Sequence, residues 1–159
     1  MTKKTVFLTG GTGNMGWAGF QELYKKGKFN IRLLARDSRK NHKLLDKYVG
    51  DPSVTVVWGD LTRYEDVLAG VTGSDYVLHV GGMVSPAADY YPEKTLKVNV
   101  SAAENVVKAI LAQPNASEIK AVYIGSVAQY GDRNPPCHWG GADEPQTPAK
   151  FDMYALSKI

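Results

Sequence analysis

Two patterns of apolar and polar positions alternate along the chain. Short apolar runs rich in β-branched residues predict five buried strands at 3–9, 30–36, 54–58, 75–80 and 120–126. Amphipathic stretches with helical spacing lie between them, at 14–26, 39–48, 64–68 and 92–112. This alternation predicts an α/β fold, a Rossmann-type doubly wound parallel sheet with helices on both faces. Right-handed crossovers then predict the strand order 3-2-1-4-5.

Local signals mark where several of the predicted helices begin and end. Gly27 suits the C-cap of the first helix, Ser38 the N-cap of the second and Thr62 the N-cap of the third. Pro92 opens the long fourth helix. After a proline-rich stretch at 131–148, which is typical of a surface loop, helical spacing returns at 151–159.

The first predicted strand leads directly into a glycine-rich turn, with a G-x-x-G-x-x-G spacing, before the first helix. Glycines allow turns and close approaches that a Cβ would prevent. The helix N-terminus beyond them offers free N–H groups and a positive dipole end to an anion. The turn is either a dinucleotide site or an ordinary glycine-rich strand-to-helix turn, and the flanking elements favour the first. We expect the cofactor to contact Gly10, Thr12, Gly13, Asn14, Met15 and Gly16.

Further candidates follow the next strands, because ligands of such sheets bind at the carboxyl ends of the strands. Arg36 suits the 2′-phosphate of NADP, whereas the adjacent Asp37 would suit the ribose hydroxyls of NAD. Arg32 and Arg39 are candidate helpers of Arg36. Asp60 either accepts a hydrogen bond from the adenine amino group, with Leu61 packed on the ring, or caps the following helix. The sequence therefore predicts NADP as the cofactor, with NAD as the alternative.

Acid–base chemistry is suggested by Tyr154 and Lys158, which are four residues apart and share one helix face. A nearby ammonium favours a phenolate, and such a tyrosine can exchange a proton with a substrate hydroxyl or carbonyl. Ser126, at the end of the fifth strand, could hold the substrate oxygen, and Asn99 could support a water that relays protons to the lysine. His79 lies inside an apolar strand, where we expect a structural role.

Five motifs in order resemble those of the extended short-chain dehydrogenases/reductases, the group of NAD(P)-dependent epimerases, dehydratases and reductases. Residues 9–16 match the family's T-G-x-x-G-x-x-G, and residues 154–158 match its Y-x-x-S-K in full. Residues 75–82, 99–103 and 123–131 resemble D-x-x-x-H-x-A-A, N-h-x-G-T (h, apolar) and S-S-x-x-x-Y-G. In these three blocks Gly81 and Gly82 replace two alanines, alanines replace the last two residues of the second motif, and Gly125 replaces the first serine.

The resemblance implies that Ser126, Tyr154 and Lys158 form a catalytic triad, with Asn99 as a fourth member. The glycine replacements are expected to loosen the cofactor wall and to leave the chemistry unchanged. The family continues well beyond the catalytic lysine, so residues 1–159 are expected to be an incomplete NAD(P)-binding Rossmann domain, inactive alone. On the nicotinamide-ribose side, the cofactor is expected to meet Val80, Gly81, Gly82, Tyr154 and Lys158.

The leading functional interpretation is an oxidoreductase that transfers hydride between a nicotinamide and a carbonyl or hydroxyl carbon, with Tyr154 as proton donor and acceptor. One alternative is a nucleotide-sugar epimerase or dehydratase with tightly held NAD. An alternative of another class is a non-catalytic dinucleotide-binding or sensor domain. The expected substrate is an unidentified small molecule. Two loop segments could line the edge of the substrate pocket: Tyr90–Tyr91 and Cys137–Trp139. A homodimer is a candidate assembly.

Composition and charge limit the classes of protein and of binding partner that the sequence allows. The chain has 159 residues, 43% of them hydrophobic and 22% charged, which is typical of a globular domain. The net charge of +3 is small and scattered, so we expect no nucleic-acid partner. No apolar run has the length of a membrane span, no secretory signal is evident, and the chain has one cysteine, which together predict a cytoplasmic protein without a membrane partner. No ligand spacing indicates a metal site.

Overall fold

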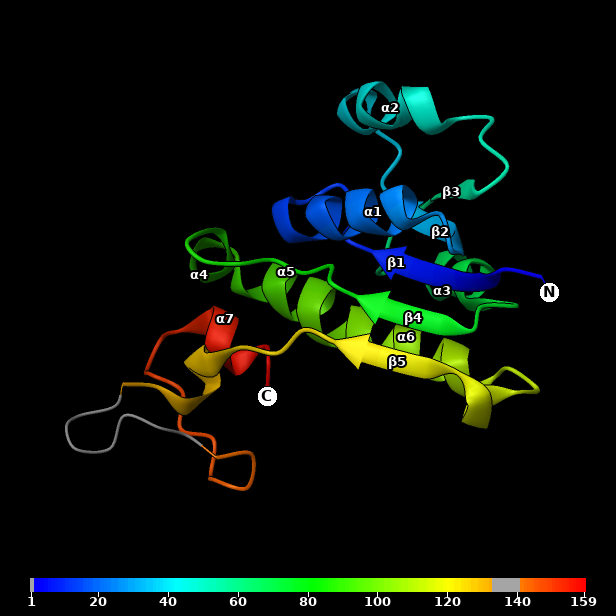
Figure 1. Cartoon of the computed structure of the whole chain (residues 1–159). Helices are drawn as coiled ribbons and strands as arrows, with labels where there is room; N and C mark the ends of the chain where they lie inside the picture. The colour runs from blue at the N-terminus through cyan, green and yellow to red at the C-terminus, as the bar shows by residue number, and fades with distance from the viewer. Residues whose placement is uncertain (1, 133–140) are drawn as a thin grey trace. The chain divides into compact units, whose positions relative to one another are not determined.

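Figure 1 shows the computed structural model of the chain, which describes residues 2–132 and 141–159. Contacts between Cα atoms divide the chain into two compact units. The first unit comprises Met1–Gly81 and Ser101–Tyr123, and the second comprises Gly82–Val100 and Ile124–Ile159. The organisation of 1–159 as one domain stays a prediction.

The first unit contains a parallel five-stranded sheet in the order β3-β2-β1-β4-β5, which confirms the predicted fold class and strand order. In register, Val6 of the central strand lies opposite Ile31 on one side and Tyr76 on the other. The fifth strand is three residues shorter than predicted. The strands are β1 (Lys4–Thr9), β2 (Phe29–Ala35), β3 (Val54–Trp58), β4 (Tyr76–His79) and β5 (Lys120–Tyr123).

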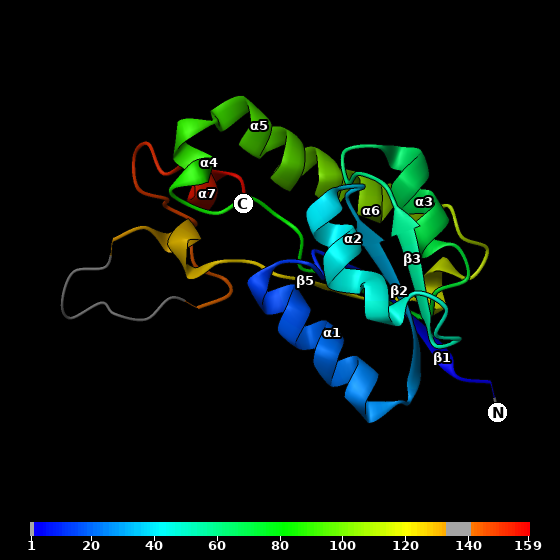
Figure 2. The same ribbon diagram turned by 90° about the horizontal axis from the view of Figure 1, so that it is seen from above.

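Helices cover both faces of this sheet because apolar side chains of the strands point to both sides (Figures 1 and 2). On one face, α1 (Asn14–Lys26) and α2 (Arg39–Leu45) pack with the 3₁₀ turn η1 (Asp46–Tyr48) around buried Leu8, Phe20 and Leu33. On the other face, α3 (Tyr64–Val71) and α6 (Ala102–Leu111) pack around buried Phe7 and Val77. A further 3₁₀ turn, η3 (Ala116–Glu118), precedes β5.

Two of the predicted caps are confirmed and one is wrong. Gly27 ends α1 in the left-handed conformation, with φ of 61°. Ser38 caps α2, where its hydroxyl oxygen accepts from the Asn41 N–H at 3.3 Å. Arg63, and not Thr62, is the N-cap residue of α3, because the Thr62 hydroxyl donates back to Asp60 instead.

The second unit is built from short helical segments: α4 (Ala87–Tyr90), α5 (Pro92–Leu96), the 3₁₀ turn η4 (Val127–Tyr130) and α7 (Met153–Leu156). The helix predicted at 92–112 is interrupted by a π-helical turn, η2 (Lys97–Ser101), between α5 and α6. The helix predicted at 151–159 is only one turn long. It begins after Asp152, whose carboxylate accepts from the Ala155 N–H at 2.8 Å, and it packs against α4, α5 and η4.

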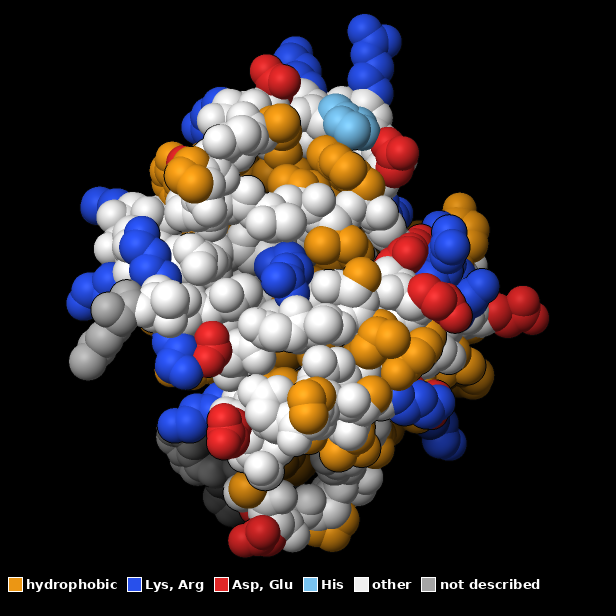
Figure 3. Space-filling model, turned by 90° about the vertical axis from the view of Figure 1, so that its right-hand side faces the viewer, with side chains coloured by type: hydrophobic (Ala, Val, Ile, Leu, Met, Phe, Trp, Pro, Cys, Tyr) orange, Lys and Arg blue, Asp and Glu red, His pale blue; other side chains and the backbone are white. Residues whose placement is uncertain are grey.

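Charged side chains of both signs are mixed on the surface, as they are along the sequence. On the face shown in Figure 3, Lys and Arg side chains are interspersed with Asp and Glu side chains rather than gathered into a patch of one sign. None of the helices formed by residues 2–132 and 141–159 has the length and apolar character needed to cross a bilayer. In the same residues, no group of three or more His, Cys, Asp or Glu side chains is arranged to hold a metal ion.

Candidate functional site

The glycine turn of the first unit is closely packed. Gly10 has φ of +70°, and a Cβ on it would lie 2.6 Å from the Gly81 Cα atom. A Cβ on Gly16 would lie 2.1 Å from the carbonyl oxygen of Gly10. The Gly13 N–H closes the turn by donating to that same oxygen at 2.9 Å. Gly10 and Gly16 are therefore glycines by steric necessity, which agrees with the turn predicted from the spacing.

The N-terminus of α1 has the features of an anion site. Its N-cap residue is Gly13, no side chain caps the first turn, and that turn contains no acidic residue. Asn14 and Met15 are exposed, and Thr12 is half-buried. The N–H groups of the first turn and the positive end of the helix dipole are thus left for an external acceptor. These residues fit the pyrophosphate of a dinucleotide.

Gly81 follows β4 and lies against the same turn. Its N–H donates to the Thr9 hydroxyl at 3.1 Å, and the Thr9 hydroxyl also bonds to His79 Nδ1 at 2.9 Å. His79 is 3% exposed and stacks on the Tyr123 ring, as expected for a structural histidine. A Cβ on Gly81 would lie 2.6 Å from Leu61 Cδ1. The expected loosening of the cofactor wall is therefore not seen at Gly81, because Leu61 occupies the space that an alanine would take.

The turn after β2 carries Arg36 and Asp37, the two candidate ligands of the adenosine ribose. The Arg36 side chain is exposed, and its carbonyl accepts from Asn41 Nδ2 at 2.8 Å. The Asp37 carboxylate pairs with His42 Nε2 at 2.7 Å, and the His42 ring stacks on the Trp58 ring with centroids 3.9 Å apart. Asp37 is therefore engaged by the chain itself.

Arg32, a candidate helper of Arg36, binds the end of a helix instead. The Arg32 guanidinium donates to the carbonyls of Gly70 and Thr72 at the C-terminal end of α3, where burial lowers its pKa. A helix C-terminus leaves carbonyls without intrahelical donors, and a cation satisfies them well. Arg32 stabilises α3 and is not a helper of Arg36.

Asp60 closes the turn before α3 but does not cap the helix, whose N-cap residue is Arg63, so the helix-capping interpretation of Asp60 is wrong. Its Oδ1 accepts from both the N–H and the hydroxyl of Thr62, each at 2.8 Å, and its own N–H donates to Asp66. Leu61 is half-buried and packs on the core beneath α3 and α6. The contacts of Asp60 and Leu61 with adenine stay predictions.

The tyrosine and the lysine lie together in the second unit. Tyr154 is in α7, and Lys158 Nζ lies 5.9 Å from the centroid of its ring. The ammonium donates to the carbonyl oxygen of Ile124 at 2.9 Å. Burial lowers the pKa of Lys158, because the charged form loses hydration. The Ile124 carbonyl was missed by the sequence analysis, since no side-chain pattern marks a backbone acceptor.

Ser126 lies after β5 rather than at its end, because the strand stops at Tyr123. It is the N-cap residue of η4, and its hydroxyl oxygen accepts from the Ala128 N–H at 3.2 Å. The turn η4 packs directly against α7, the helix of Tyr154. The segment that carries Ser126 is thus next to the segment that carries the tyrosine.

Asn99 is buried in the π-helical turn η2, with 1% of its surface exposed. Its Oδ1 accepts from the Met83 N–H at 2.7 Å, and its Nδ2 donates to the Met83 carbonyl at 2.9 Å and to the Ser157 hydroxyl at 2.7 Å. A Cβ on Gly82 would lie 3.0 Å from Asn99 Oδ1 and 3.6 Å from Lys158 Nζ. Asn99, Gly82 and Lys158 are therefore neighbours. The relay of protons through a water at Asn99 stays a prediction.

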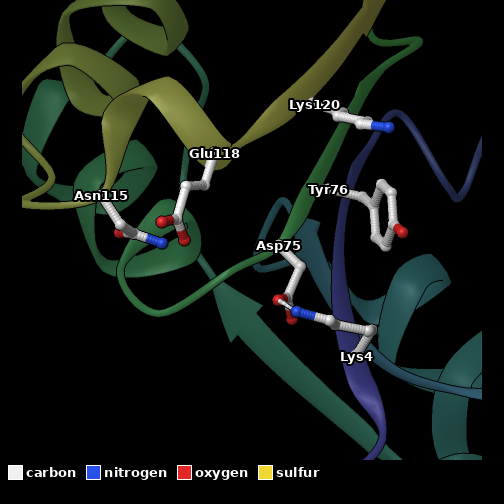
Figure 4. Close-up of a pocket in the computed structure, with 6 residues that line it drawn as sticks. All are labelled: Lys4, Asp75, Tyr76, Asn115, Glu118 and Lys120. Atoms are coloured by element: carbon white, nitrogen blue, oxygen red, sulfur yellow. Dashed lines mark hydrogen bonds and ion pairs between the residues drawn. The ribbon is translucent and has the colours of Figure 1, made fainter.

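Other sequence candidates lie elsewhere on the chain. Cys137–Trp139 fall outside the described residues. Tyr90 and Tyr91 are 76% and 61% exposed, and their pocket role stays a prediction. A polar hollow of about 190 Å³ lies at the amino ends of β1, β4 and β5, whereas the glycine turn follows the carboxyl end of β1 (Figure 4). It is lined by Lys4, Asp75, Tyr76, Asn115, Glu118 and Lys120.

Fold and site together define a dinucleotide-binding chain that also carries a tyrosine–lysine pair. Residues 6–159 match the model of the NAD-dependent epimerase/dehydratase family, and the chain belongs to that family. A protein of Rickettsia akari described as UDP-glucose 4-epimerase is 32% identical over 130 residues, which cover 76% of this chain and 38% of the relative. The corresponding protein of Rickettsia conorii is 32% identical over 113 residues, which cover 68% of this chain and 33% of the relative. The chain thus spans about a third of the length of these relatives.

Solved structures show the same fold. The UDP-glucose 4-epimerase of Thermus thermophilus, solved in complex with NAD, superposes with a TM-score of 0.74 at 22% identity, covering 97% of this chain and 47% of that one. The UDP-Glc/GlcNAc 4-epimerase of Campylobacter jejuni gives a TM-score of 0.79 at 18% identity, covering 98% of this chain and 46% of that one.

Proposed function

We propose that this protein catalyses reversible oxidation and reduction at a hydroxyl-bearing carbon, with Tyr154 as the proton donor and acceptor. The observation that carries the proposal is the proximity of two side chains: Lys158 Nζ lies 5.9 Å from the centroid of the Tyr154 ring and donates to the Ile124 carbonyl oxygen. A nicotinamide dinucleotide, when bound, supplies the redox partner for such a reaction.

Each residue of the set has a chemical role in this proposal. The Tyr154 phenol donates its proton to a substrate oxygen and takes it back in the reverse direction. The Lys158 ammonium favours the transient negative charge on the phenol oxygen. The Ser126 hydroxyl oxygen accepts from the Ala128 N–H, which leaves the hydroxyl hydrogen to donate to the substrate oxygen. Together these groups hold the substrate oxygen and transfer its proton.

The dinucleotide is assigned to the first unit. Support comes from the N-terminus of α1, which carries no capping side chain and no acidic residue, and from Gly10 and Gly16, where a Cβ has no room. We propose NADP as the preferred form because Arg36 is exposed while Asp37 is paired with His42. NAD is the alternative, and the Thermus thermophilus epimerase was solved with that form.

For the substrate we propose a nucleotide sugar, with epimerisation at a sugar carbon as the net reaction. The support is the similarity to relatives described as UDP-glucose 4-epimerases, which reaches 32% identity over 130 residues. A reductase of a small ketone or aldehyde is the second candidate, because the cationic Arg36 favours the cofactor form used in reductive work.

The test is an activity assay on the longest natural polypeptide that contains this chain. Epimerisation of UDP-glucose to UDP-galactose, followed by chromatography of the sugar nucleotides, is the expected activity. Oxidation of NADPH with a panel of carbonyl compounds, and no epimerisation, would favour the reductase instead. Tight dinucleotide binding without either activity would overturn the proposal and favour a non-catalytic binding domain.

A further inference from the structure

Ser157 is a buried hydroxyl beside the candidate catalytic residues, and it is 2% exposed. Its oxygen accepts from Asn99 Nδ2 at 2.7 Å, and its hydrogen is donated to the Tyr154 carbonyl at 2.8 Å. The hydroxyl therefore acts both as an acceptor and as a donor within the protein. One of the two bonds is local to α7, and the other joins residues 58 positions apart.

Asn99, the partner of Ser157 in this hydrogen bond, is itself held in place by the backbone of Met83. Its amide bonds to both the N–H and the carbonyl of Met83, as a neighbouring strand would. The second N–H of Nδ2 is the group that reaches Ser157. A buried amide with these partners has one orientation that satisfies them all, because a rotated amide would place donors against donors. Ser157 is thus bonded to a side chain that cannot follow its movement.

The helix that Ser157 holds is too short to be stable by itself. α7 has four residues, and isolated helices shorter than about 12 residues are marginal in water. Its N-terminal side is fixed by Asp152, which accepts from Ala155, and by Asp89, which accepts from the Met153 N–H. At its C-terminal side two long-range bonds hold the chain: Ser157 accepts from Asn99, and Lys158 Nζ donates to the Ile124 carbonyl oxygen. Only the first of them joins the C-cap residue of α7 itself.

We propose that Ser157 is a positioning residue that fixes Tyr154 and Lys158 for proton transfer by bonding the C-terminal end of α7, which lies between them in sequence, to Asn99. The proposal rests on the proposed function of Tyr154, and it assigns Ser157 a role of its own. Gly82 completes the arrangement, because a Cβ there would press on Asn99 Oδ1 at 3.0 Å.

The first test is amide hydrogen exchange on this chain, which needs no substrate. In Ser157→Ala we expect faster exchange at Leu156, Ser157 and Lys158, whose N–H groups donate to backbone carbonyls of the same turn. Ser101→Ala, which removes an exposed hydroxyl, is the matched control and should leave these rates unchanged. Unchanged exchange rates in Ser157→Ala would show that Ser157 does not hold α7 in place and would overturn the proposal.

The second test separates positioning from stability. In the longest natural polypeptide, Ser157→Ala should lower kcat about 10- to 100-fold, because small misplacements of reacting groups have effects of that order. The dissociation constant of the dinucleotide should change far less than kcat, because most of the expected cofactor contacts lie outside α7. Ser157→Thr, which keeps the hydroxyl, should restore kcat and the slow exchange. A kcat that stays at the wild-type value, or a threonine variant that behaves as the alanine variant does, would overturn the positioning role.

Failure of the proposed function is recognised separately. If Tyr154→Phe turns over substrate at the wild-type rate, Tyr154 is not the proton donor, and the proposed function is wrong. The exchange measurement would still report whether Ser157 anchors α7, since it depends only on the Asn99–Ser157 bond.

Discussion

At the scale of single residues, the β2–α2 turn shows how neighbouring charges divide their roles. Asp37 is bonded to His42, which itself stacks on Trp58, whereas the exposed Arg36 is held only through its backbone carbonyl in the contacts described above. The bond to His42 gives the Asp37 carboxylate a partner within the chain, so it is less available to accept from the ribose hydroxyls of NAD. Arg36 is therefore the residue that decides the cofactor form in our proposal.

The prediction for Arg36 is a loss of NADP affinity. Arg36→Ala should weaken NADP binding about tenfold, since one charge-assisted hydrogen bond at a partly exposed site contributes about 1.5 kcal/mol. NAD binding should change little. Calorimetric titration of both cofactors into wild type, Arg36→Ala and the control Lys43→Ala measures the effect. Equal affinity of wild type for the two cofactors would instead identify Asp37 as the ribose ligand.

Lys158 predicts a dependence of stability on alkaline pH. Burial lowers its pKa below the ordinary 10.5, so the unfolded chain binds this proton more tightly than the folded chain does. The folded state is therefore penalised at neutral pH, and its free energy of unfolding should rise as the pH passes from the lowered pKa towards 10.5.

Denaturant unfolding as a function of pH checks this effect. Lys158→Met should remove that rise, whereas Lys94→Met, at an exposed position, should keep it. If the wild type and Lys158→Met show the same alkaline slope, Lys158 is not desolvated in the folded state.

At the scale of elements, Asp75 joins the amino ends of three strands. Its carboxylate pairs with Lys4 and accepts from the Thr5 N–H, and its carbonyl accepts from the Lys120 N–H (Figure 4). The hydrogen bond from Lys4, and then that from Thr5, lower the pKa of Asp75 below the ordinary 3.8. The stabilisation is present above that value and is lost as the pH falls through the lowered pKa.

Asp75→Asn should therefore be less stable than wild type at neutral pH and should lose less stability on acidification. Thermal unfolding between neutral and acid pH is the measurement, with exposed Asp46→Asn as the control. Parallel acid curves for wild type and Asp75→Asn would contradict the assignment.

Element boundaries were predictable where local chemistry sets them. The bounds of α1 and β3 agree with the prediction, because glycines flank α1 and β-branched residues fill β3. The π-helical turn at Asn99 was not predictable, because it accompanies bonds to Met83 and Ser157 that are distant in sequence. The early end of β5 likewise places Ser126 in a turn that no local pattern marks.

At the scale of the whole molecule, the two units carry different parts of the proposed reaction. The first unit has the residues suited to bind a dinucleotide, and the second has the residues suited to hold and move a proton. The order of the motifs in the sequence predicted both sets of residues. It could not reveal Ser157 as a contact of Asn99, because a motif gives residue types and not their partners.

Dinucleotide binding by the first unit can be tested on this chain. Gly13→Ala places a methyl group at the N-cap of α1, where its nearest neighbour in the fold is the Gly10 carbonyl oxygen at 3.3 Å. This contact is tight but needs only a small shift of the turn, so folding should be retained. We expect at least a tenfold loss of affinity for the dinucleotide, about 1.4 kcal/mol, because the backbone no longer approaches the pyrophosphate closely.

The control is Gly19→Ala in the same helix, where a Cβ meets no atom within 4 Å. It should bind as wild type does, and thermal shift with added NAD or NADP reports both variants. A Gly13→Ala variant that is stabilised by dinucleotide as strongly as wild type would remove α1 from the proposed site.

The central claim is that Tyr154 transfers the proton. The most direct measurement compares kcat and the dinucleotide dissociation constant of wild type, Tyr154→Phe and the exposed control Tyr24→Phe, in the longest natural polypeptide that contains the chain. We predict that Tyr154→Phe lowers kcat about 10²- to 10⁴-fold, the usual contribution of a general acid or base, while the dissociation constant stays at the wild-type value. A Tyr154→Phe enzyme that turns over at the wild-type rate would contradict the account.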